Sequence, residues 1–418
     1  MKKNKVFILF YIFLLVYFPL INGINVIHVL SIYAFFSILI KKNYRKEIVK
    51  IVYQSKIFVV ILGVGIIIMY MLVFYLLNGT QNISNIYIYI LLLPEVIICI
   101  VYLCLYLCEY QFTKYDLLNL LLCVCMLQAI IAILAFVNTE FHHLTLTWLK
   151  EEVSTNYYNQ WSEVRLFGFS SGLTSTMPVL QAMMTCIAVF LGITKQKKYF
   201  FYAPVLAFSA IINSRTSFII LGIGGILLIF FNKSFDSKKF LVLILAVLIT
   251  IFCSVFIAKI IKLYSGGTFD WLHTGLLEIS DFFKGEKIGT FNVLLGNGFL
   301  RIPEGNGFWL GTGHDIYGFA QGSDNGFIND IWRIGVLWTF FLYIVFFMYF
   351  SSILKKGNKF NNFISCYFIL IILIFSFKGT IISSNCFLNT ALLIIAYINV
   401  EKKRDYKNEI GKHLSCNI

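Results

Sequence analysis

Residues 57–77, IFVVILGVGIIIMYMLVFYLL, carry no charged side chain and form a run long enough to cross a hydrocarbon core of ~30 Å as a helix. Similar apolar runs recur on both sides of this one, from the start of the chain to residue 399. Only a helix satisfies all of its own backbone groups in such a run, and no alternating pattern of a barrel strand is visible. The sequence therefore predicts an all-α, polytopic transmembrane bundle.

The composition excludes a soluble protein. The chain is 59% hydrophobic and only 13% charged, which is too little polar surface for water to be its main solvent. Aromatic residues make up 17%, and Tyr and Trp are often near the ends of the apolar runs, as rings at a membrane interface are. We interpret residues 1–418 as a single integral membrane domain.

The apolar runs predict about twelve helices and two long outer loops. The loops are residues 138–176 and 261–325. The helices are expected at residues 6–22, 24–40, 57–77, 86–108, 117–137, 177–194, 199–212, 217–231, 240–260, 326–350, 363–377 and 380–399.

The net charge of +14 is a signal of topology. If the chain starts inside, 24 of its 34 Lys and Arg residues are in cytoplasmic pieces. These pieces are residues 1–5, 41–56, 109–116, 195–198, 232–239, 351–362 and the tail from 400. This follows the positive-inside rule and places both termini in the cytoplasm. It gives no reason to expect a nucleic-acid partner.

The cysteines predict no disulfide bonds, and the N-terminus predicts no cleaved signal peptide. The ten cysteines are in helices, at helix ends or in the tail, so a disulfide framework is not expected. The start MKKNKVFILFYIFLLVYF lacks a small-residue cleavage site and leads into another apolar run, which indicates an uncleaved first helix.

Both outer loops contain segments with helical spacing, at residues 144–153 and 270–283. These segments either lie flat on the outer leaflet or pack on the ends of the bundle. The span 199–212 is short, because about fourteen residues cover only ~21 Å. The polar corner NSRTS at 213–217 follows it, so we expect Arg215 below the outer interface, in a cavity open from outside.

Three outer segments combine arginines with glycine-containing turns. RLFGFSSGLTSTMPVLQAMM starts at Arg165, SRTSFIILGIGG contains Arg215, and the segment 294–338 contains Gly296-Asn297-Gly298 and Asp324-Asn325-Gly326. In order, spacing and side of the membrane they resemble the O-antigen polymerase and ligase superfamily of bacterial envelope glycosyltransferases. The resemblance implies a GT-C-like fold in the bacterial inner membrane and covers nearly the whole chain.

The sequence departs from that family at one informative place. Ligases of the family carry a His-Asn pair where this chain has Asp324-Asn325, which favours a polymerase. The general base therefore stays open between Asp324 and His314. The family's Arg-x10-Gly pattern is not matched well either, because Gly225 follows Arg215 with nine residues between them.

The resemblance implies a donor and an acceptor that are oligosaccharides linked to polyprenyl diphosphate. Guanidinium groups bind diphosphate oxygens in pairs and stay charged at any pH. Arg165, Arg215 and, more weakly, Arg301 are the expected diphosphate-binding residues, and Asp324 or His314 is the expected base for the acceptor hydroxyl. No DxD or His-rich cluster argues for a metal, and no cofactor is expected.

Each of these residues also has a simpler interpretation. Arg165 would serve as a headgroup anchor, Arg301 as a solvated loop residue, and His314 as an ordinary loop histidine. Asp324 would cap the helix that starts near residue 326.

Two further ionic features lie within the predicted helices. Asp330 and Arg333 are three residues apart on one helix face, so we expect them to pair, with a role in lining a cavity as the alternative. Glu95 follows Pro94 in the fourth predicted helix and is expected to face a polar partner.

Three hypotheses remain at the level of the sequence. The first is a polymerase of lipid-linked repeat units for O-antigen or a capsule-like polysaccharide, which works alone or, as the family resemblance suggests, with a chain-length regulator and a flippase. The second is a ligase that moves finished glycan to another acceptor. The third is a flippase or secondary transporter, which would depend on residues near the midplane such as Glu95.

Overall fold

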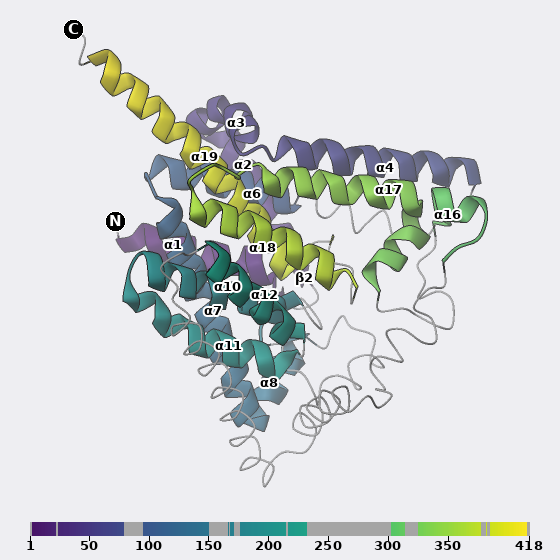
Figure 1. Ribbon diagram of the computed structural model, residues 1–418, viewed down its shortest axis with the longest axis horizontal. Coiled ribbons are helices and arrows are strands. Elements are labelled where there is room, and N and C mark those ends of the chain that lie inside the picture. The colour runs from purple at the N-terminus through teal and green to yellow at the C-terminus, as the bar shows by residue number, and fades with distance from the viewer. Residues whose placement is uncertain are drawn as a thin grey trace.

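The computed structural model describes residues 2–21, 24–78, 95–149, 166, 168–170, 176–214, 216–231, 302–313, 325–377, 382 and 385–415. This part of the chain is almost wholly helical (Figure 1). A short antiparallel hairpin of β1 (Leu20–Ile21) and β2 (Ile24–Asn25) joins the first two helices.

Most predicted spans correspond to a helix. The helices are α1 (Lys2–Tyr17), α2 (Val26–Ile40), α3 (Lys42–Gln54), α4 (Phe58–Asn78), α6 (Ile97–Glu109), α7 (Lys114–Val137), α8 (Thr139–Leu149), α10 (Thr176–Thr194), η2 (Lys197–Phe201, a 3-10 helix), α11 (Tyr202–Asn213), α12 (Thr216–Phe231), α16 (Asn306–Leu310), α17 (Gly326–Ser351), α18 (Lys359–Phe375) and α19 (Cys386–Ser415). The predicted span 240–260 and the loop segment 270–283 lie outside the described residues.

Several helices have the length and composition of membrane spans. Four of them, α4, α7, α10 and α17, are long and apolar enough to cross a membrane, and there are five spans if the bent pair α2 and α3 is counted as one. The helices α1, α6, α12 and α18 are apolar but shorter. The described chain is thus that of a helical membrane protein, while a total of twelve spans stays a prediction.

The helices differ in how much of their surface they bury. In the apolar window of α10, 89% of the residues are buried, because α10 packs against α7, α11, α12 and α19. In α4 only 28% are buried, and Leu62 and Leu76 are 60% and 79% exposed. Figure 1 shows α4 beside α17, with which it packs, at the edge of the molecule. An apolar face of this size is compatible with lipid as the solvent.

The connecting piece predicted at 41–56 is itself a helix. The chain bends by 112° between α2 and α3. In α3, Tyr44 and Ile51 are buried while the lysines point outward, and the Tyr44 hydroxyl donates to the Glu109 carboxylate at the end of α6. An amphipathic helix of this kind is suited to lie along a membrane interface.

The ends of three predicted helices differ from the structure. The helix expected at 6–22 stops at Tyr17, because Phe18 adopts a positive φ of 30° and Pro19 follows. The helix expected at 380–399 starts at Cys386, where Asn385 accepts from the Leu388 N–H, and continues to Ser415. The span expected at 199–212 is divided between η2 and α11.

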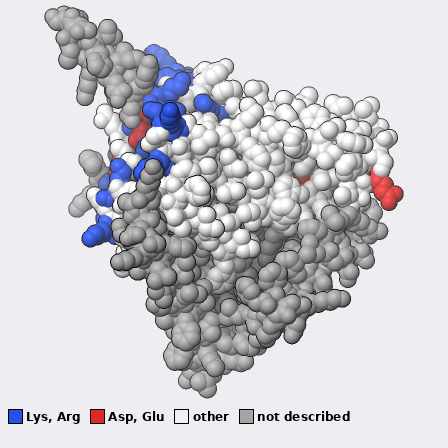
Figure 2. Space-filling view, viewed as in Figure 1, with Lys and Arg blue, Asp and Glu red and all other residues white. Residues whose placement is uncertain are grey.

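The basic segments gather at one end of the molecule (Figure 2). Lys114 on α7 pairs with Glu401 on α19 at 3.6 Å, and the segment 351–362 lies against Lys56 and Lys195 across two cavities. We call this region, formed by residues 41–56, 109–116, 195–198, 351–362 and 400–404, the basic end. The segments predicted to share one side of the membrane are therefore together at one end of the fold.

Candidate functional site

The five predicted site residues, Arg165, Arg215, Arg301, His314 and Asp324, all lie outside the described residues. Their chain neighbours are described, and two of these, Ser214 and Asn325, lie at the ends of α11 and α17 away from residues 195–198 and 351–362 of the basic end. The candidate site is therefore built from the neighbours.

The first loop and the α11–α12 corner are joined directly. The backbone N–H of Leu166 donates to Asn213 Oδ1 at 2.8 Å, and Asn213 Nδ2 donates to the Ser209 carbonyl at 3.0 Å. Leu166 is 3% exposed and Asn213 is 2% exposed. The Asn213 amide thus accepts one hydrogen bond through its oxygen and donates another through its nitrogen. The connection is rigid, because leaving either atom unpaired in this interior would cost ~1–3 kcal/mol. Segments that are distant in the sequence thus form one corner.

Side-chain hydrogen bonds fix the corner itself. Ser214 ends α11 with an extended backbone, and its hydroxyl lies 2.9 Å from the Thr216 hydroxyl. The Ser217 hydroxyl donates to the Ala210 carbonyl at 2.9 Å across the turn. The prediction of a short helix followed by a polar corner is confirmed, since α11 covers twelve residues.

The turn after Leu166 packs closely on α7. Gly168 has a positive φ of 57°, and a Cβ at this position would lie 2.5 Å from Gln128 Nε2. Gln128 Nε2 in turn lies 3.3 Å from Met177 Sδ at the start of α10. Ser170 Oγ lies 3.3 Å from Cys386 Sγ, which connects the same turn to α19. Only glycine allows both the backbone angle and the close approach here.

One buried amide in this region has no hydrogen-bond partner in the part of the chain that the structure describes. Gln181, on α10 one turn after Met177, is 0% exposed. Neither its Nε2 nor its Oε1 forms a hydrogen bond with any described residue. A buried polar group of this kind is rare in native proteins and calls for an explanation, of which a bound polar ligand is one.

The first turns of α17 contain a buried ion pair. Arg333 Nη1 lies 3.6 Å from Asp330 Oδ1, and the two side chains are 4% and 0% exposed. The Tyr343 hydroxyl donates to Ser376 Oγ at 2.7 Å and lies 3.4 Å from Asp330 Oδ2. The expected pairing of Asp330 with Arg333 is confirmed. Because charges at this depth are costly, such a pair in a membrane protein indicates a functional position.

The N-cap of α17 is Asn325 and not Asp324, the residue considered from the sequence. Asn325 is the N-cap, and its Oδ1 accepts from the Ile328 N–H at 3.3 Å. The interpretation of Asp324 as the cap is therefore wrong, because the helix starts one residue later than that role requires.

The end of the second long loop packs against a kink in α17. Gly335 has a φ of 80° and a ψ of 166°, which interrupt the helix. The Trp332 carbonyl accepts instead from the Thr312 N–H at 2.8 Å and from the Thr312 hydroxyl at 3.0 Å. A Cβ on Gly311 would lie 2.6 Å from Gly335 N, so the two backbones touch. The kink thus fixes α16 and residues 311–313 beside the Asp330–Arg333 pair.

A second ionic contact, which is partly buried, joins α2 to the residue Glu95 just before α6. His28 Nδ1 lies 2.5 Å from Glu95 Oε1, and the side chains are 36% and 14% exposed. The polar partner expected for Glu95 is thus His28. Glu95 precedes Glu109 by roughly 21 Å of helix, and Glu109 lies at the basic end 3.7 Å from Lys41.

Sequence reasoning missed Asn213, Gln181, Tyr343 and Ser376 as members of this region. Their types were visible, but Asn213, Tyr343 and Ser376 form contacts with segments far away in the chain. Gln181 has no side-chain hydrogen bond with any described residue. The excess of polar residues around 209–217 was the one signal that could have indicated Asn213.

The fold, the apolar spans and the separated charge define a multi-pass helical membrane protein. Compared with family models, with curated proteins and with solved structures, the chain matches none.

Proposed function

We propose that this protein is a membrane glycosyltransferase that joins lipid-linked oligosaccharide repeat units into O-antigen or a capsule-like polysaccharide. It acts on the outer face of the bacterial inner membrane, with about twelve helices and both termini in the cytoplasm. The acceptor hydroxyl attacks the anomeric carbon of the donor glycan. The bond to the polyprenyl diphosphate breaks, and a general base takes the hydroxyl proton.

The observation that carries this proposal is the hydrogen bond between Leu166 and Asn213. Arg165 precedes Leu166 in the chain and Arg215 follows Ser214, so the two predicted diphosphate-binding arginines belong to segments that meet. Each of these segments therefore supplies an arginine next to the bond in the sequence, and a pair of guanidinium groups suits a diphosphate leaving group, whose charge grows in the transition state.

The kinked helix adds the second half of the proposed site. Asp324 directly precedes Asn325, which caps α17, and His314 directly follows Gly313, which is beside the kink. Asp330 and Arg333 contribute a buried ion pair one to two turns further along α17. Asp324 or His314 acts as the base, and Arg301 is a weaker third diphosphate-binding residue.

The His28–Glu95 contact favours one alternative function, a flippase or secondary transporter. An ionisable pair within the apolar spans is typical of transporters. The contact lies toward the end of α6 away from the basic end, however, whereas transporter sites are near the midplane. A ligase differs from the polymerase in the acceptor alone, and the lack of a His-Asn pair argues against it.

The test is the surface-glycan ladder of cells that lack the gene, complemented at matched protein level. We expect the deletion to leave a core that carries a single repeat. Arg215→Ala should restore the ladder at least ~100-fold less well than wild type, because it removes an electrostatic contact to the leaving group. Arg215→Lys should restore it in part. The controls Lys195→Ala, at the basic end, and Glu95→Gln should restore it fully.

Two results would contradict this proposal. Loss of even the single repeat in the deletion would indicate a flippase or a ligase. A normal ladder with Arg215→Ala would show that the diphosphate is bound elsewhere.

A further inference from the structure

The basic end contains two neighbouring cavities that the proposed function does not use. The first has a volume of about 580 Å³ and is lined by the end of α3, the start of α7 and α19. The second, of about 520 Å³, lies between α10, the start of α7 and the start of α18. Both are lined by Lys355 and Asn358 in the connection from α17 to α18, so they form one continuous basic surface.

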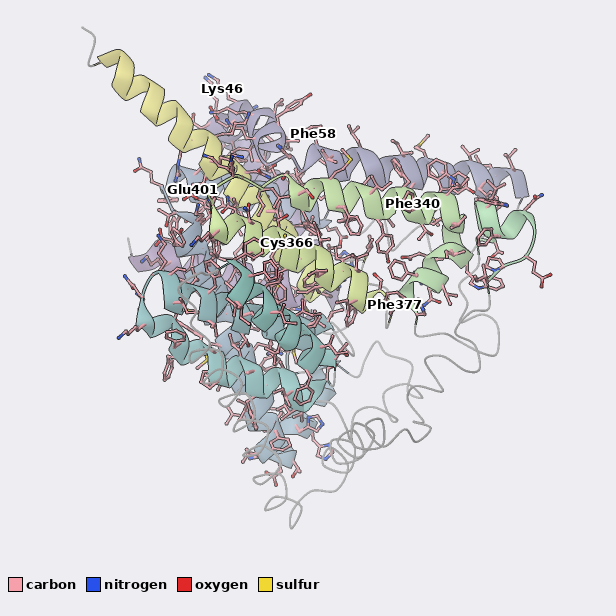
Figure 3. The ribbon with its side chains drawn as sticks, in the orientation of Figure 1. Lys46, Phe58, Phe340, Cys366, Phe377 and Glu401 are labelled. Atoms are coloured by element: carbon pink, nitrogen blue, oxygen red, sulfur yellow. The ribbon has the colours of Figure 1, made fainter. Side chains whose placement is uncertain are left out.

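The charge around these cavities is strongly one-sided. Among the described residues, their walls contain one carboxylate, that of Glu401, which is labelled in Figure 3. It is 7% exposed. It accepts from the Lys114 backbone N–H at 2.9 Å and lies 3.6 Å from Lys114 Nζ. Apart from Lys114, the lysines in the walls form no ion pair within the described residues. They are Lys56, Lys195, Lys355, Lys356, Lys359, Lys402 and Lys403.

The lysines are close enough for their positive charges to repel one another. The pKa of Lys402 is lowered from its usual value, first by burial and then by the charges of Lys56, Lys355 and Lys403. Lys56 has a positive φ of 58°, which a lysine rarely adopts. Lys195 Nζ lies 4.2 Å above the Tyr115 ring, so this ammonium group is positioned as well. Like charges gathered in this way destabilise a fold unless an anion joins them.

A buried amide faces the first cavity. Asn361, in the first turn of α18, lines this cavity and is 2% exposed. Its Oδ1 forms no hydrogen bond with any residue that the structure describes. The start of α18 also directs its positive dipole end toward this region, which favours a negative ligand. A helix start and clustered lysines thus meet at one place and favour an anion, while the unpaired Asn361 oxygen is an acceptor that suits an O–H or N–H group of a ligand.

We propose that these cavities form a binding site for a phosphate-bearing anion. The ligand is either the headgroup of an anionic phospholipid or a soluble compound with one or more phosphate groups. Lysine binds phosphate as a mobile point charge, so a cluster of lysines tolerates either source. The volumes fall within the range of ~300–1,000 Å³ typical of ligand sites.

The positive-inside rule alone explains why the lysines are on this side. It does not require them to surround a cavity, and it gives no partner to Asn361. A specific site therefore predicts that lysines within the cavities differ from lysines elsewhere on the basic end. Lys42 and Lys46 on α3 are exposed and do not line either cavity, so they are the matched controls.

The experiment measures binding to the purified full-length protein in neutral detergent. One arm counts bound phosphatidylglycerol against phosphatidylcholine by native mass spectrometry, and the other titrates inorganic pyrophosphate by calorimetry. Lys355→Gln/Lys402→Gln should weaken binding of the preferred probe at least tenfold or so, as expected for two lysines near phosphate. Asn361→Asp should weaken it too, because a carboxylate replaces an amide of equal size. Lys42→Gln/Lys46→Gln should bind as wild type does.

The two arms distinguish the sources of the anion. Loss confined to phosphatidylglycerol indicates a lipid headgroup, and loss confined to pyrophosphate indicates a soluble phosphate. Absence of binding in both arms would overturn the proposal, as would equal weakening in the cavity and control variants. Because both measurements use purified protein and no glycan, their outcome is independent of the glycan ladder.

Discussion

At the scale of the residue, polar side chains buried in the apolar core are the positions that packing alone does not explain. Gln181 is fully buried with an unpartnered amide within the described residues, and Asp330 is fully buried beside Arg333. An apolar substitute would be more stable at Gln181, since burying an unpaired polar group costs free energy. At Asp330 this holds only if Arg333 is replaced as well, because a lone buried arginine would be left without its partner. A bound polar ligand would offset this cost at Gln181.

Gln181 gives a prediction that separates stability from activity. Gln181→Leu removes the buried amide and keeps a similar volume, so the free energy of unfolding should rise by about 1–2 kcal/mol. Thermal unfolding in detergent would show this as a higher Tm. If the amide contacts substrate, the same variant should restore the glycan ladder poorly.

The control for Gln181 is on the same helix. The Thr185 hydroxyl donates to the Gln181 carbonyl at 2.8 Å, within α10. Thr185→Val should therefore leave the ladder unchanged and alter the Tm only slightly. A normal ladder with Gln181→Leu would assign the amide to the fold alone.

The sequence could predict contacts that lie within one element but not those between elements. Asp330 and Arg333 are three residues apart, so helical spacing alone indicated their pair. Leu166 bonds to Asn213 across 47 residues, and Tyr343 to Ser376 across 33. No periodicity connects such positions, because their contact depends on how whole helices pack.

At the scale of the element, the kink in α17 shows how tertiary packing overrides a local pattern. Residues 326–350 read as one apolar helix, and the structure has a helix over almost the same range. The break at Gly335 arises because Trp309 and Gly311 of another segment touch its backbone. The composition of α17 contains no sign of that contact other than the glycine itself.

Gly311 tests the kink directly. Gly311→Ala would place a Cβ 2.6 Å from Gly335 N and 2.7 Å from the Arg333 carbonyl, where backbone cannot yield. Gly311 also has a φ of 82°, which is unfavourable for alanine. We expect a loss of about 2–4 kcal/mol in the free energy of unfolding, measured as a lower Tm.

The comparison for Gly311 is a glycine with free space around it. A Cβ at Gly222 of α12 would meet nothing within 4 Å. Gly222→Ala should be neutral or slightly stabilising, because alanine favours a helix more than glycine does. Equal Tm values for the two variants would mean that residues 309–312 do not hold the kink.

At the scale of the whole molecule, the most reliable prediction was that the Lys- and Arg-rich segments lie together at one end. Five of the basic pieces identified from the sequence meet at the basic end, as the shared walls of the two cavities show. Such a pattern is readable from sequence because it depends only on which segments lie between apolar runs. The positions of Arg165, Arg215, Arg301, His314 and Asp324 within the site were not readable in this way. They depend on loops whose paths no repeat or period determines.

The orientation of the molecule is the last prediction, and it bears on both proposed sites. The positive-inside rule predicts that the basic end is in the cytoplasm and that the corner of Asn213 and the start of α17 face outward. Lys46 on α3 and Glu304 before α16 are both exposed. With a membrane-impermeant maleimide on intact cells, Glu304→Cys should be labelled, and Lys46→Cys should be labelled only after the cells are opened. The wild-type chain, with its native cysteines, gives the background. The reverse pattern would place the arginine corner on the cytoplasmic side, where an outer-face polymerase cannot act, and would direct the lysine cavities to the outer leaflet.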